Sequence, residues 1–105
     1  MSNPRIVVLL PLMASMAAHT AQASEALMEK SGCLSCHRVD QKLIGPTFKE
    51  VATRYRGRND IVPILLQKVR EGGEGEWGDI PMAANSEERV SDDNLKAVIE
   101  WILSL

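Results

Sequence analysis

The chain has 105 residues, which is the length of a single domain. It carries 12 Lys and Arg residues against 14 Asp and Glu residues, a net charge of −2. A mildly acidic chain lacks the basic surface that nucleic-acid binding needs, so no nucleic-acid partner is expected.

The first 23 residues have the pattern of a secretory signal peptide. Arg5 precedes an apolar run at residues 6–18, and the segment 21–23 (AQA) supplies the small residues of a cleavage site. The apolar run is much shorter than the roughly 20 residues of a membrane-spanning helix. We therefore predict export to the periplasm, loss of residues 1–23 and a mature domain at residues 24–105 without stable membrane insertion. An uncleaved anchor is the alternative.

The predicted mature domain is small for a self-sufficient hydrophobic core. Domains of this size commonly depend on a disulfide, a metal or a cofactor. Removal of the signal peptide also removes His19, which leaves His37 as the only histidine of the mature domain. Met28 and Met82 remain as its only methionines.

Two helices are predicted in the first half of the mature domain. Ser24 is suited to cap a short helix that continues to about Lys30 and ends at Gly32. Residues 47–50 (TFKE) form a capping box, which starts a second helix that stops before Gly57.

Two further helices are predicted in the second half. The third begins near residue 60, accepts Pro63 in its first turn and ends at residues 72–73 (GG). The fourth is capped by Ser91, and its apolar residues recur at helical spacing. These apolar residues are Leu95, Val98, Ile99, Ile102 and Leu103.

The fold class predicted from this pattern is all-α. Runs of alternating β-branched residues, which would predict strands, do not occur in the mature domain. Two long connections remain, at residues 31–46 and 72–90. Long structureless loops in a small domain are usually functional or disordered, so both are candidates for a binding site.

The first of these loops contains the motif Cys-Leu-Ser-Cys-His at residues 33–37. This spacing is the attachment signature of a c-type haem, in which Cys33 and Cys36 add to the vinyl groups and His37 binds the iron. A thioredoxin-like pair would need a βαβ setting, and a structural zinc would need a fourth ligand. A disulfide between Cys33 and Cys36 would close a loop of only two residues and add little to the stability of the domain. Haem c is therefore the predicted cofactor.

The second axial position of the iron is either open or filled by methionine, since no second histidine remains. Met28 lies on the apolar face of a predicted helix, where filling of the core is its expected role. Met82 follows Pro81 in the irregular loop, where no helix face requires it. We therefore predict His37 and Met82 as the axial ligands, with the loop forming the distal side of a haem pocket.

With these residues in place, the chain resembles the small bacterial class I cytochromes c of the cytochrome c-551/c-552 type. The resemblance rests on GCLSCH, IGPTFKEVA, WGDIPMAAN and SDDNLKAVIEWILSL, which together cover most of the mature chain. It implies a cytochrome c fold, with about four short helices around one covalently bound haem, and a monomeric protein. The first and last helices would cross and shield the haem.

The resemblance also implies supporting roles for four residues. Pro46 would accept a hydrogen bond from Nδ1 of His37, and Asn85 would reach the sulfur of Met82. Lys68 and Trp77 would lie near the haem propionates. Family members often carry prolines after the ligand methionine, whereas Ala83-Ala84 follow here. The loop is therefore expected to release Met82 more readily than in relatives that carry these prolines.

The predicted function is periplasmic electron transfer between respiratory proteins. The resemblance suggests a quinol-oxidising complex, a terminal oxidase or a nitrite reductase as partners, which is an analogy at the level of fold. The alternative is a haem-based sensor of carbon monoxide or nitric oxide in which Met82 is displaced. Enzymatic activity is not expected, because the mature chain offers no distal histidine for acid–base chemistry.

Overall fold

The computed structural model describes residues 1–12 and 17–105, with side chains described outside residues 13–23. Within these residues the protein is all-helical, as predicted, and its only β-type pairing is one bridge between Gly73 and Met82. None of the described helices is long and apolar enough to span a bilayer. The elements are α1 (Ala17–Lys30), the 3₁₀ turn η1 (Cys33–Ser35), α2 (Phe48–Tyr55), α3 (Ile61–Glu71) and α4 (Asp92–Leu103).

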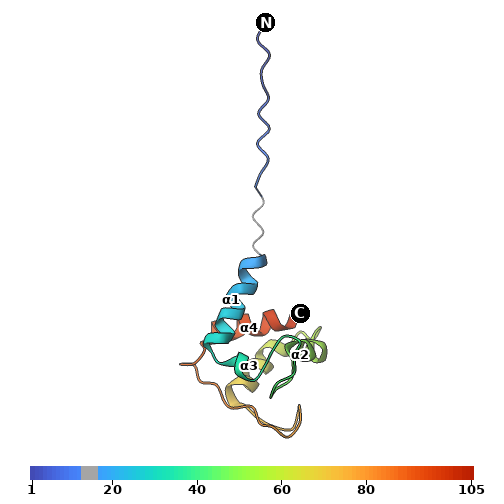
Figure 1. Cartoon of the computed structure of the whole chain (residues 1–105), viewed down its shortest axis with the longest axis vertical. Coiled ribbons are helices and arrows are strands. Elements are labelled where there is room, and N and C mark those ends of the chain that lie inside the picture. Colours follow the sequence, from blue (N-terminus) through green and yellow to red (C-terminus); the bar gives the residue numbers. More distant parts are fainter. Residues whose placement is uncertain (13–16) are drawn as a thin grey trace.

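Helix α4 lies at the centre of the arrangement and packs against α1, α2 and α3 (Figure 1). Its apolar stripe divides between two clusters. Leu95 and Ile99 join the side chains of α3, whereas Val98 and Ile102 pack on the side of α1 and α2. Met28 is completely buried in the second cluster, which confirms the prediction that it fills the core. Burial of one such side chain contributes roughly 1.5–3 kcal/mol.

The first helix begins earlier than predicted. In the full chain α1 starts at Ala17, so Ser24 lies inside the helix. The cap at Ser24 was predicted for a mature chain that begins at this residue, and for that chain it stays a prediction. The segment 17–23 (AAHTAQA) is rich in alanine, the strongest helix former, and therefore continues the helix backwards. The end at Lys30 is as predicted.

Residues 1–12 form an extended segment that leaves the helical domain (Figure 1). Their apolar side chains contribute nothing to either core cluster, since Ile6, Val7, Val8, Leu9 and Leu10 are all exposed.

The entry into α2 is fixed by the predicted capping box. The Thr47 side chain accepts a hydrogen bond from the Glu50 amide at 3.0 Å, and the Glu50 carboxylate accepts one from the Thr47 amide at 2.8 Å. Ser91 caps α4 in the same way, by accepting from the Asn94 amide at 3.2 Å. These caps satisfy amides that a helix start otherwise leaves unpaired.

The capping box makes a testable contribution to stability. Thr47→Ala is expected to lower the free energy of unfolding by about 0.5–2 kcal/mol.

The Thr47 amide holds the pKa of the Glu50 carboxyl below its ordinary value of 4.5. The ionised carboxylate therefore stabilises the folded state above that value, and the contribution is lost as the pH falls through the lowered pKa.

Urea unfolding of Glu50→Gln at a series of pH values measures this directly. The variant should be less stable than the parent at pH 7, and the difference should shrink as the pH falls below about 4. A difference that is constant over this pH range would contradict the role of the charge.

Candidate functional site

One cavity of about 540 Å³ brings the predicted site residues together. Its walls are mainly apolar and come from the two long loops and from α2, α3 and α4. A volume of this size lies within the range of cofactor and ligand pockets. The four residues singled out for chemistry all line it: Cys33, Cys36, His37 and Met82.

The cysteine–histidine motif folds as a tight turn. Gly32 adopts a left-handed conformation with φ of 80°, which starts η1 at Cys33. The Cys33 carbonyl then accepts hydrogen bonds from the amides of Cys36 at 3.2 Å and His37 at 2.9 Å. The turn brings both thiols and the imidazole to one wall of the cavity. Both cysteines are free thiols.

Burial raises the pKa of the Cys33 thiol, and a backbone hydrogen bond and the positive charge of Arg89 partly offset the effect.

The His37 ring is held by a hydrogen bond and by packing. Its Nδ1 lies 2.8 Å from the carbonyl oxygen of Pro46, as the resemblance implied. Because a carbonyl only accepts, Nδ1 carries the proton and Nε2 keeps a free lone pair. The ring also stacks on Phe48, with centroids 5.4 Å apart and planes inclined by 20°.

Gly45 is a site residue that the sequence analysis missed. A Cβ atom at this position would lie 2.5 Å from Cε1 of His37, so only glycine leaves room for the ring. The Gly45 amide also donates a hydrogen bond to the Cys36 carbonyl at 2.8 Å. Its position beside Pro46 was the available signal, but the sequence alone does not say that the neighbour in space is His37.

Met82 is held against the end of α3. Its amide and carbonyl exchange hydrogen bonds with Gly73 at 2.8 and 3.0 Å. Gly72, with φ of 69°, approaches the Met82 backbone so closely that a Cβ atom would collide with it. The two glycines were interpreted only as the end of a helix, whereas the structure adds a second role in seating the methionine loop.

Trp77 and Lys68 line the cavity, and their place near the haem propionates stays a prediction. Trp77 packs edge-on against Tyr55 at 6.4 Å, and the Arg54 guanidinium lies over its ring at 3.3 Å. Lys68 forms an ion pair with Glu76, which also accepts a hydrogen bond from the Tyr55 hydroxyl. The hydrogen bond between them raises the pKa of Lys68 and lowers the pKa of Glu76.

Asn85 is at the cavity wall, but its side-chain amide is engaged elsewhere. It donates to the carbonyls of Ala83 at 3.0 Å and Val69 at 3.3 Å. The contact with the Met82 sulfur therefore stays a prediction.

The residues that line the cavity fit a covalently bound haem. Two unpaired thiols with the required spacing directly precede a histidine whose Nδ1 is bound to Pro46, which leaves Nε2 for iron. A thioether on a second loop lines the same apolar space. Gly45 gives the imidazole its room. A small all-helical domain with this donor set is typical of a monohaem protein of the c type.

Comparison with known proteins agrees with the geometry. The chain belongs to the cytochrome c family, whose model, Cytochrome c, matches residues 21–105.

The relatives are small bacterial cytochromes. The chain is 42% identical to cytochrome c-551 of Azotobacter vinelandii over 83 residues, which cover 79% of this chain and 98% of the relative. It is 41% identical to cytochrome c-552 of Nitrosomonas europaea over 85 residues, or 81% of each chain. The crystal structure of wild-type Nitrosomonas europaea cytochrome c552 superposes with a TM-score of 0.72 at 40% identity, covering 77% of this chain and 98% of the other.

Family membership establishes the general function. The protein binds one covalent haem c and is an electron carrier, a redox partner of other proteins and not an enzyme. The predicted recognition, fold class and cofactor are thereby confirmed. The alternative of a haem-based sensor finds no support in these relatives.

The steric role of Gly45 is open to test. Gly45→Ala is expected to push the His37 ring away from Pro46, with a loss of about 1–3 kcal/mol in stability, which is typical of an overpacked site. The measurement is urea unfolding of the haem-loaded protein, together with its visible spectrum. Gly57→Ala is a poor control because its φ is 87°. Ala97→Ser, on the exposed face of α4, adds one atom where there is room and should change stability by less than about 0.5 kcal/mol. Unchanged stability and spectrum in Gly45→Ala would contradict the steric role.

Proposed function

We propose that the protein carries single electrons in the periplasm on a haem attached through Cys33 and Cys36, with His37 and Met82 as axial ligands. The single observation that supports this most is that all four residues line one cavity, although His37 and Met82 lie 45 positions apart in the sequence. When bound, the haem supplies iron that alternates between the ferrous and ferric states.

The residues of the chain have three tasks in this proposal. The Pro46 carbonyl orients the His37 imidazole and raises its basicity as a ligand. The Met82 thioether would favour the ferrous state of the iron and so raise its reduction potential. Core residues such as Leu65, Val98 and Ile102 line the cavity and exclude water.

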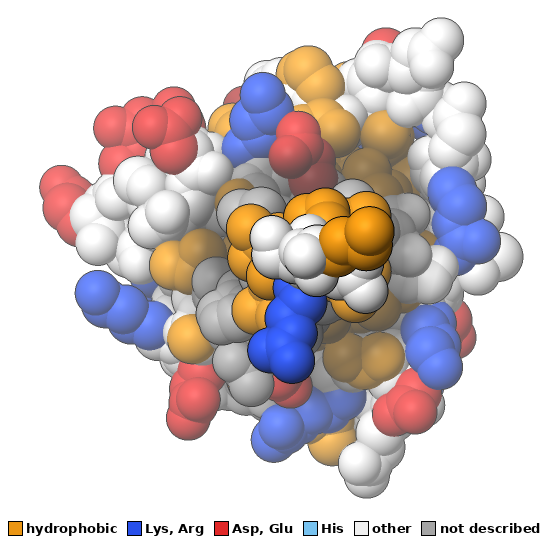
Figure 2. All heavy atoms as spheres, turned by 90° about the horizontal axis from the view of Figure 1, so that it is seen from above, with side chains coloured by type: hydrophobic (Ala, Val, Ile, Leu, Met, Phe, Trp, Pro, Cys, Tyr) orange, Lys and Arg blue, Asp and Glu red, His pale blue; other side chains and the backbone are white. Residues whose placement is uncertain are grey.

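Partners would dock where the cavity opens to solvent. Ile44 and Ile80 line the cavity and are also 53% and 65% exposed, so they mark its mouth. On the face seen in Figure 2, which looks down on the N-terminal segment, basic and acidic side chains are interspersed and no single sign dominates. Charges of this kind act mainly on the rate of association. A quinol-oxidising complex, a terminal oxidase or a nitrite reductase would be a suitable partner.

Export is proposed from the N-terminal segment. Residues 1–12 are extended and their apolar side chains pack on nothing in the domain, which suits a segment that is removed. Helix α1 would then begin at or near Ser24, since cleavage after Ala23 removes its first two turns. The contacts of Met28 with the core lie within the part that remains.

The proposed ligation predicts the response to carbon monoxide. The visible spectrum of the ferrous protein should be unchanged when the gas is added, because Met82 occupies the iron. The visible spectrum of the Met82→Ala variant should shift promptly under the same conditions, since its distal position is open. A prompt shift in the parent protein would contradict axial ligation by Met82.

The proposed export predicts a shortened chain. Protein isolated from the periplasm of a bacterium that attaches haem c should have the mass of residues 24–105 plus one haem. Replacing Ala21 and Ala23 by Leu should block removal, because the cleavage site needs small residues. An intact N-terminus in the parent would contradict the cleavage site.

A further inference from the structure

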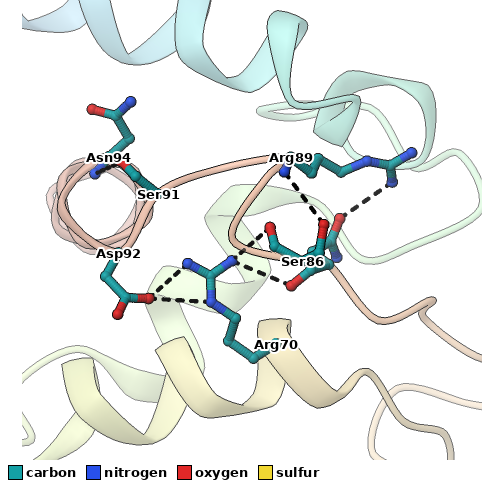
Figure 3. A network of polar contacts seen from close by, with 7 residues as sticks. Arg70, Ser86, Arg89, Ser91, Asp92 and Asn94 are labelled. Carbon is teal, nitrogen blue, oxygen red and sulfur yellow. Dashed lines mark hydrogen bonds and ion pairs between the residues drawn. The ribbon is translucent and has the colours of Figure 1, made fainter.

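Arg70, in the last turn of α3, joins three parts of the molecule (Figure 3). Its Nε and one Nη bond the same Asp92 carboxylate oxygen at 3.2 and 2.6 Å. Its other Nη donates to two backbone carbonyls, Asn85 at 3.2 Å and Ser86 at 3.0 Å. One guanidinium therefore connects α3, the start of α4 and the loop that carries Met82.

The Arg70 side chain is only 16% exposed. The other cations in ion pairs of the described residues, Arg58, Lys68 and Lys96, are 41–61% exposed. Exposed pairs contribute little to stability, whereas a mostly buried guanidinium with several partners is costly to leave unpaired.

The carbonyls that Arg70 binds belong to the methionine loop. Asn85 and Ser86 lie three and four residues after Met82. On the other side, Met82 is bridged to Gly73, two residues beyond α3. The Asn85 amide also bonds the Val69 carbonyl at 3.1 Å. The end of α3 thus holds the loop on both sides of the methionine.

The sequence of the loop supplies no rigidity of its own after Met82. Ala83 and Ala84 leave the backbone free to rotate, where a proline would restrict it. The hydrogen bonds of Arg70 to the next two carbonyls therefore restrict a segment that the local sequence leaves mobile.

We infer that Arg70 is a positioning residue that keeps Met82 on the haem iron, by fixing the Asn85 and Ser86 carbonyls through a guanidinium oriented by Asp92. This inference rests on the proposed ligation by Met82. Release of the methionine by a movement of the loop away from α3 would cost the two carbonyls their charged donor. Opening of the loop is therefore disfavoured for as long as Arg70 is in place.

Lysine cannot replace the guanidinium here. Its ammonium is a single point charge, whereas Arg70 uses two edges of a planar guanidinium to reach a carboxylate on one side and two carbonyls on the other. Arg70→Lys keeps the charge near the end of α3, so its effect on Met82 reports the geometry of the fork and not the helix dipole.

The experiment is a titration of the ferric, haem-loaded protein with imidazole, followed by its visible spectrum. Imidazole binds only where Met82 has left, so its apparent affinity is proportional to the open fraction. Arg70→Lys is expected to raise that affinity about tenfold, the effect of about one charged hydrogen bond. Asp92→Asn, which removes only the orienting carboxylate, should raise it less and serves as the test if Arg70→Lys does not accumulate.

Three controls accompany the titration. Arg58→Lys makes the same change at an exposed pair between α2 and α3 and should leave the affinity within twofold of the parent. Ile61→Val removes a methylene from a core residue that does not itself line the cavity, and measures the effect of lost stability. Met82→Ala gives the affinity of the fully open site.

The outcomes separate the two proposals. The positioning role is supported if the apparent affinity for imidazole rises in Arg70→Lys or Asp92→Asn and stays unchanged in Arg58→Lys and Ile61→Val. Affinity unchanged in both Arg70→Lys and Asp92→Asn, with strong binding by Met82→Ala, overturns it and leaves the ligation by Met82 standing. An equal rise in Ile61→Val also overturns it, because general destabilisation then explains the effect. Equal binding by Met82→Ala and the parent overturns the ligation and the positioning role together.

Discussion

The position of the His37 imidazole is the constraint on which the rest of the structure depends. Nδ1 is bound to the Pro46 carbonyl, one face of the ring stacks on Phe48, and the absence of a side chain at Gly45 gives the ring its space. Because Thr47 caps α2 directly after Pro46, the helix start also fixes the carbonyl that orients the ring. A histidine fixed in this way presents Nε2 to the cavity without further reorganisation.

The loop that carries Met82 is held in a different way from the His37 ring. This loop has no helix or sheet of its own, so its position depends on what it contacts. The end of α3 supplies those contacts through the bridge at Gly73, the carbonyl of Val69 and the guanidinium of Arg70. A ligand carried on a loop and held by long-range contacts can be stable in place and still be released when those contacts are removed.

The small hydrophobic core explains why both constraints meet at one cavity. Helix α4 forms two clusters with the other helices, and these clusters continue into the cavity wall through Leu95, Val98, Ile99 and Ile102. In a domain of this size a bound group adds the apolar contacts that the side chains alone do not provide. The haem is in this sense part of the core of the protein and also its redox centre.

Local patterns in the sequence determined the helices, their caps and the attachment motif, because capping and apolar spacing act over a few residues. The absence of a second histidine and the irregular loop around Met82 predicted Met82 as a ligand, and the resemblance added Pro46. Gly45 was missed, since its steric role depends on His37, eight residues away and folded back upon it. The role of Arg70 was missed because its partners lie 15 to 22 residues further along the chain. Contacts of this range arise only when α3 packs against α4, so the tertiary structure alone decided which residues position the predicted ligands.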